Sequence, residues 1–111
     1  MEAENTSNPA QYALKQALDR MWLQFLPMMR ERIAILETAV GAASGLSTEK
    51  REAAHSAAHK LAGGLGTFGL EEGTLLAREA EAIFAGDLAS EHAGRLAEIA
   101  SRLRNMIEGR T

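Results

Sequence analysis

Residues 54–69 read AHSAAHKLAGGLGTFG, and the spacing of the apolar residues in this stretch decides the fold. These residues recur at alternating steps of four and three, which places them on one stripe of a helix. They are Ala54, Ala58, Leu61, Leu65 and Phe68. Because the stripe passes through the glycines without a break, the spacing predicts a helix that packs by this face and continues to about residue 67.

The composition of the whole chain is typical of an all-α protein. Its 111 residues suffice for one hydrophobic core and are too few for two. Alanine, leucine, glutamate and arginine dominate, and the chain contains only two prolines and one tryptophan. These are the preferences of helices rather than of sheets.

The composition also excludes several classes of protein. The absence of cysteine rules out disulfides, thiolate metal sites and a cysteine nucleophile, and a cytoplasmic location is expected. The net charge of −3 comes from mixed acidic and basic residues, so there is no basic footprint for nucleic acid. No apolar run approaches the roughly 20 residues of a membrane span, and the opening MEAENTSNPA lacks the pattern of a signal peptide. A protein or small-molecule partner is therefore favoured over nucleic acid or a membrane.

Four further helices are predicted on either side of this stretch. The first is expected to start at Pro9 with Asn8 as its cap, and to end or kink at Pro27. Its apolar stripe is expected to pack onto the rest of the protein. The stripe consists of Leu14, Leu18, Met21, Trp22 and Phe25. The other three helices are expected near residues 29–40, 70–85 and 90–107, from their own apolar stripes.

Loops of a few residues between these helices favour antiparallel neighbours. The sequence therefore predicts an antiparallel four-helix bundle with an additional N-terminal helix at one end. Residues 1–7 are expected to form a flexible tail, and residues 8–111 a single bundle domain.

His59 is predicted to be exposed. At about 100° per residue it lies roughly 140° from the centre of the core stripe, and Gly63 lies almost opposite that stripe. Each glycine inside a helix lowers its stability by about 1 kcal/mol relative to alanine. We therefore expect the glycines after His59 to bring a functional or packing gain that offsets this loss. One such gain is access, because glycines beside an exposed imidazole let another protein approach it closely. The alternative, that the glycines allow close helix packing or end the helix, stays open for Gly64 and Gly66 and is expected for Gly69.

The segment GLGTFG at residues 64–69 also fits the letters of the nucleotide-binding motif G-x-G-x-x-G. That motif has physical meaning only between a strand and the start of a helix. Here it ends a helical stripe, so nucleotide binding is rejected.

The stretch AAHKLAGGLGTFGL resembles the signature of histidine-containing phosphotransfer domains, the modules of bacterial two-component relays that include the phosphorylated first domain of chemotaxis kinases. In that family an exposed histidine on a helical bundle is followed by a hydrophobic residue and by glycines at set distances. Here these positions hold His59, Leu61, Gly63 and Gly69.

The resemblance implies a phosphorelay intermediate. His59 would accept a phosphoryl group on its distal ring nitrogen and exchange it with the aspartate of a receiver domain, or receive it from a histidine kinase. The chain would be a carrier without its own ATP site or cofactor, with Mg²⁺ supplied by the receiver. Imidazole is largely neutral at cytoplasmic pH, which leaves one nitrogen free as a nucleophile.

The resemblance also assigns other residues. Glu81, on the next helix, would accept a hydrogen bond from the proximal nitrogen of His59, although it could equally be one more solvated acid. The surface expected to dock the partner consists of His55, Lys60, Ala62, Gly63 and Gly66. Many relatives carry lysine where this chain has Ala62, which leaves open how the phosphoryl charge is screened. A monomer is expected.

Two other interpretations remain. His55 and His59 are spaced as a metal-binding pair on one helix face, with Glu52 as the nearest third ligand. Alternatively, the protein is a helical-bundle interaction module without phosphotransfer, in which His59 is incidental.

Overall fold

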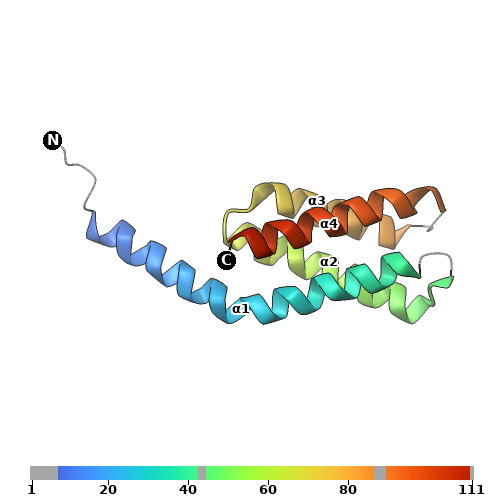
Figure 1. Ribbon diagram of the computed structural model, residues 1–111, viewed down its shortest axis with the longest axis horizontal. Coiled ribbons are helices and arrows are strands. Elements are labelled where there is room, and N and C mark those ends of the chain that lie inside the picture. The colour runs from blue at the N-terminus through green and yellow to red at the C-terminus, as the bar shows by residue number, and fades with distance from the viewer. Residues whose placement is uncertain (1–7, 43–44, 87–89, 111) are drawn as a thin grey trace.

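The computed structural model describes residues 8–42, 45–86 and 90–110, and these residues form four α-helices (Figure 1). The helices are α1 (Pro9–Gly41), α2 (Thr48–Thr67), α3 (Glu71–Ala85) and α4 (Ala93–Arg110), and a 3₁₀ turn, η3 (Ser90–His92), precedes α4. Helix α1 packs against α2 and α4, and α3 packs against the same two helices. This arrangement confirms the all-α four-helix bundle. The predicted flexible tail, residues 1–7, lies outside the described residues.

The predicted N-terminal helix is not a separate element. Helix α1 runs through Pro27 without a break, so the two helices expected on either side of Pro27 are one helix of 33 residues. Proline cannot donate to the carbonyl of Leu23, but Leu23 lies on the exposed side, where water can hydrate that carbonyl. Of the two outcomes predicted at Pro27, an end or a kink, the end is therefore wrong. Figure 1 shows α1 bending between its two halves, as expected for a helix with an internal proline.

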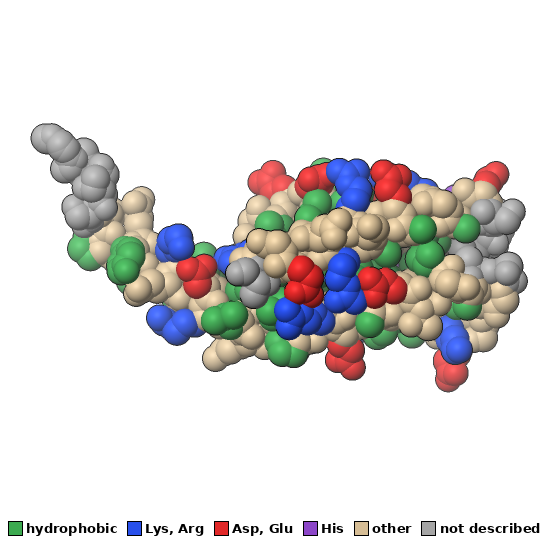
Figure 2. All heavy atoms as spheres, viewed as in Figure 1, with side chains coloured by type: hydrophobic (Ala, Val, Ile, Leu, Met, Phe, Trp, Pro, Cys, Tyr) green, Lys and Arg blue, Asp and Glu red, His purple; other side chains and the backbone are tan. Residues whose placement is uncertain are grey.

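The first half of α1 projects beyond the bundle (Figure 1). Leu14 is 60% exposed and Phe25 38%, whereas Trp22 is 1% exposed and begins the buried face of α1. The expectation that the whole first stripe packs onto the bundle is therefore wrong, because no other helix extends along the projecting part. Hydrophobic side chains on this half face solvent in Figure 2.

Side-chain caps and one glycine set the helix ends, and those at Asn8 and Gly69 agree with the sequence predictions. Asn8 Oδ1 accepts the backbone N–H of Ala10 at 3.0 Å, and Ser47 Oγ accepts that of Lys50 at 3.2 Å. Beyond the C-terminus of α2, Gly69 has φ +75°, and the N–H of Leu70 reaches back to the carbonyl of Leu65 at 2.9 Å. This is the Schellman turn, and it directs the chain into α3.

The core lies along the bundle axis and is almost entirely aliphatic. Ala54, Ala58, Leu61 and Leu65 of the predicted α2 stripe are buried, and Phe68 is half-buried. At the end of the bundle nearest the projecting half of α1, the ring of Trp22 meets that of Phe68 edge to face, with centroids 5.1 Å apart. The guanidinium of Arg110 lies over the Trp22 ring at 5.0 Å.

Acidic and basic side chains alternate over the seam between α1 and α4 (Figure 2). Arg30 pairs with Glu108 and Arg104 with Glu37, each at 2.7 Å. Hydrogen bonds from these arginines hold the pKa of Glu37 and of Glu108 below the usual range. These exposed pairs align α1 with α4 while contributing little stability each.

Candidate functional site

His59 lies on the outer face of α2, and its side chain is 71% exposed. Ala58 and Leu61 on either side of it are fully buried, so the backbone that carries the imidazole is held by the core. A reactive group on a rigid helix is presented in one place, which suits recognition by a second protein.

Glu81 of α3 lies beside this imidazole. The Nδ1 of His59 donates a hydrogen bond to Oε2 of Glu81 at 2.9 Å. An ionised carboxylate only accepts, so this contact favours the neutral tautomer that carries the ring proton on Nδ1 and the lone pair on Nε2. Since α3 follows α2 through the Gly69 turn, the fold itself places Glu81 beside His59. The structure thus brings together the two residues that the sequence analysis paired.

A second imidazole approaches the same carboxylate. His55, one turn before His59 on α2, has its Nε2 3.7 Å from Oε2 of Glu81, beyond hydrogen-bond distance. Its side chain is half-buried. His55 thus flanks the pair formed by His59 and Glu81, on the face where the sequence analysis placed it.

A shallow hollow next to the imidazole is lined by His59, Ala62, Gly63, Arg78 and Glu81. Ala62 is only 5% exposed, so the expectation that it presents surface to a partner is not met. It faces α3, where Thr74 Oγ1 donates to its carbonyl at 3.1 Å. Arg78 was not identified from the sequence. Its position three residues before Glu81, on the same side of α3, was the available signal.

The glycines after His59 serve different purposes. A Cβ added at Gly63 would meet nothing within 4 Å, so the space beside His59 is open there. A Cβ at Gly64 would lie 2.4 Å from Cε of Met29, and one at Gly66 would lie 3.3 Å from Oγ1 of Thr74. Close packing against α1 and α3 therefore accounts for Gly64 and Gly66, while Gly63 has no packing role.

Lys60 faces a different hollow from the one beside His59. It lies over a groove between α1 and α2. The groove also contains the side chains of Met21, Phe25, Met28 and Phe68. The sequence analysis did not foresee that α1 would contribute exposed apolar side chains next to the histidine face.

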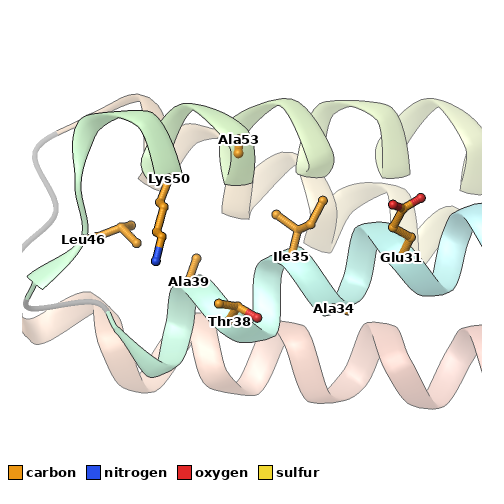
Figure 3. A pocket seen from close by; sticks show the side chains of 8 residues that line it. All are labelled: Glu31, Ala34, Ile35, Thr38, Ala39, Leu46, Lys50 and Ala53. Carbon is orange, nitrogen blue, oxygen red and sulfur yellow. The ribbon is translucent and has the colours of Figure 1, made fainter.

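Another apolar hollow lies between α1 and α2, toward the loop that joins them (Figure 3). Ile35, Ala39 and Leu46 line it, with Glu31 at one end and Lys50 at the other. None of the residues singled out by the sequence lies there, so this hollow is not part of the candidate site.

The metal interpretation gains no support from the geometry. Within residues 8–42, 45–86 and 90–110, no three histidine or acidic side chains are placed to hold a metal ion. The carboxylate nearest His55 and His59 is that of Glu81, and its Oε2 is engaged by the His59 ring proton. In the same part of the chain, no helix is both long and apolar enough to cross a bilayer.

Comparison with known protein families matches residues 20–109 to the Hpt domain. The match covers most of the chain, which therefore belongs to the Hpt domain family. Domains of this family are phosphotransfer modules of two-component systems; they interact with histidine kinases and receiver domains and have no catalytic site of their own. No curated protein and no solved structure matches the chain.

Proposed function

We propose that the protein is a phosphorelay intermediate in which His59 accepts a phosphoryl group on Nε2 and passes it on. The observation that carries the proposal is the hydrogen bond from His59 Nδ1 to Glu81, because it leaves an exposed Nε2 with a free lone pair. That atom is the nucleophile that transfer requires.

The exchange with a receiver domain balances as follows. The lone pair of Nε2 forms a bond to phosphorus while the bond between phosphorus and the aspartyl oxygen breaks, and the aspartate returns to a carboxylate. The ring keeps its Nδ1 proton in the hydrogen bond to Glu81. The carboxylate thereby offsets the positive charge that develops on the imidazole. The reverse reaction uses the same contacts.

The partner supplies the remaining machinery. Phosphoryl transfer needs positioning and charge stabilisation, and we assign the Mg²⁺ and its acidic pocket to the receiver domain. The carrier itself then needs no ATP site and no cofactor. A cytoplasmic monomer fits this role, because one exposed histidine has to meet two different partners in turn.

Docking is proposed to use the exposed face around His59. Gly63 leaves the approach to the imidazole open, and His55 and Gly66 border it. The groove between α1 and α2 extends this face with the half-exposed Met21 and Met28. Flexible thioether side chains of this kind adapt to the surface of a partner.

Phosphotransfer from a panel of phosphorylated receiver domains tests the proposal. Wild type should acquire an acid-labile, base-stable label, whereas His59→Gln should acquire none. His92→Gln, which changes the histidine of η3, should be labelled as wild type. Labelling of His59→Gln would refute the assignment. Failure of wild type with both the receivers and the cognate kinase would leave an interaction bundle without phosphotransfer.

A further inference from the structure

Arg78 is a charged residue in the hollow beside His59. The phosphoryl exchange described above gives it no role. It lies on α3, three residues before Glu81, and lines the hollow together with His59 and Gly63. It is the only lysine or arginine among the described residues that line this hollow. The hydroxyl of Thr74, one turn earlier on α3, donates to the Ala62 carbonyl and holds this part of α3 against α2.

The acidic residues around Arg78 are already engaged by other groups. Glu79 pairs with Arg95 of α4 at 2.6 Å, and Glu72 pairs with Arg102 of the same helix. Glu81 accepts the His59 ring proton. Within the described part of the chain, the guanidinium of Arg78 therefore has no ion pair or hydrogen bond of its own. It is an exposed cation whose five donors remain available.

Phosphorylation of His59 would change the charge of this hollow. A phosphoryl group brings a charge of about −1.5 to −2, and the carboxylate of Glu81 already lies against the same ring. Two like charges this close repel each other unless a cation lies between or beside them. Ala62 and Gly63, which line the same hollow as Arg78, contribute no charge, and a Cβ at Gly63 would meet nothing within 4 Å.

From this geometry we propose that Arg78 binds the phosphoryl group on His59 and stabilises the phosphorylated state. The inference rests on the proposed function, because it requires phosphorylation of His59. The planar guanidinium matches two phosphoryl oxygens at once, which a lysine ammonium cannot do. Arg78, on the neighbouring helix α3, thus screens the phosphoryl charge that Ala62, which has no charge, cannot screen.

Phosphoramidate is a suitable probe because it is a small phosphoryl donor that needs no docking surface. Its phosphorus–nitrogen bond breaks as the bond to Nε2 forms, and ammonia leaves. At a fixed donor concentration, Arg78→Ala should reach an equilibrium ratio of phosphorylated to free His59 about three- to fivefold lower than wild type. Arg78→Lys should recover part of the loss, and the difference should shrink at high salt. Circular dichroism shows whether each variant is folded.

A second measurement detects the contact between Arg78 and the phosphoryl group without any phosphoryl transfer. The phosphorus resonance of the phosphorylated protein titrates with pH as the phosphoryl group gains its last proton. Removal of the Arg78 cation should move that midpoint upward by several tenths of a pH unit. Arg20→Ala removes an exposed arginine of α1 that has no ion pair among the described residues; it is the matched control and should match wild type.

The outcomes separate the two claims. If His59 is labelled in wild type and Arg78→Ala equals wild type in both occupancy and phosphorus titration, the assignment of Arg78 is overturned while the carrier function stands. If His59 is labelled in no variant, by phosphoramidate or by a receiver, the proposed function fails and the assignment of Arg78 fails with it.

Discussion

The Nδ1 of His59 lies 2.9 Å from Oε2 of Glu81, although the two residues are 22 positions apart on different helices. This hydrogen bond joins α2 to α3 beside an imidazole that is otherwise open to solvent. The proposed chemistry at Nε2 depends on this contact.

Replacement of Glu81 should slow phosphoryl transfer without unfolding the protein. A hydrogen bond to a charged group contributes roughly 1.5 kcal/mol, so Glu81→Ala should lower the rate about tenfold. Glu81→Gln keeps an acceptor and should recover part of the rate. Nitrogen-15 NMR of the His59 ring provides the structural readout, because the variant without an acceptor should populate both tautomers. A single, unchanged tautomer in Glu81→Ala would contradict a positioning role.

A bulky residue at Gly63 should block transfer from a receiver while the bundle stays folded. No atom lies within 4 Å of a Cβ at this position, so Gly63→Leu is accommodated in the free protein and its side chain stands beside His59. Misplacement of the receiver by about an ångström is enough to lower the transfer rate at least tenfold. Stopped-flow measurements test the loss of transfer from the receiver, and circular dichroism tests whether the bundle stays folded. Labelling by phosphoramidate, which needs no docking, should be much less affected.

Alanine substitutions at Gly63 and Gly69 should change stability in opposite directions. Gly63 is an exposed glycine inside a helix with open space around it, so Gly63→Ala should raise the free energy of unfolding by about 0.5 to 1 kcal/mol. Gly69 has φ +75°, where an alanine is strained, so Gly69→Ala should lower that energy by about 1 kcal/mol. Urea denaturation measures both. If both substitutions raised the free energy of unfolding, or both lowered it, the placement of Gly63 inside α2 and of Gly69 beyond its end would be contradicted.

The projecting half of α1 should be dispensable for the stability of the bundle, and Trp22 should not. Removal of residues 1–19 takes away largely exposed side chains and two surface ion pairs, Lys15–Asp19 and Asp19–Arg110, and should change the free energy of unfolding by less than about 0.5 kcal/mol. Trp22→Ala removes a ring that is 1% exposed and should cost about 3 kcal/mol or more. Comparable losses from the two changes would mean that the projecting half packs in solution.

Acid should weaken the seam between α1 and α4. Arg104 lowers the pKa of Glu37, and Arg30 lowers that of Glu108. A carboxylate with a lowered pKa stabilises the fold above its unfolded pKa of about 4.5, and this contribution is lost as the pH falls through the folded pKa. Glu37→Gln should therefore be less stable than wild type at pH 7, and the difference should shrink at about pH 3. Urea midpoints at the two pH values measure it, and a difference independent of pH would exclude the ion pair as its cause.

The buried stripes of α2, α3 and α4 could be predicted from the sequence because helical spacing and caps are local signals. That the first half of α1 projects beyond the bundle could not be predicted, because its apolar spacing resembles that of a packed helix. Only the lengths of the other helices show that none of them covers it. The sequence left open whether Pro27 ends the helix or kinks it, because the outcome depends on whether the carbonyl that proline leaves without a partner can reach water.

The resemblance to the phosphotransfer family implied the pairing of His59 with Glu81, and the structure shows the contact because the short turn at Gly69 returns α3 along α2. The burial of Ala62 was missed because its angular position lies at the edge of the core stripe, where only the actual contact with α3 decides exposure. Arg78 was missed because its position three residues before Glu81 becomes informative only when its neighbours are seen to have other partners.

The most direct test of the central claim is NMR of the phosphorylated protein, with nitrogen-15 in the histidine rings and phosphorus detection. The account predicts one phosphoryl group, bonded to Nε2 of His59, with Nδ1 as the nitrogen that faces Glu81. A phosphoryl group on Nδ1, or on any residue other than His59, would contradict it.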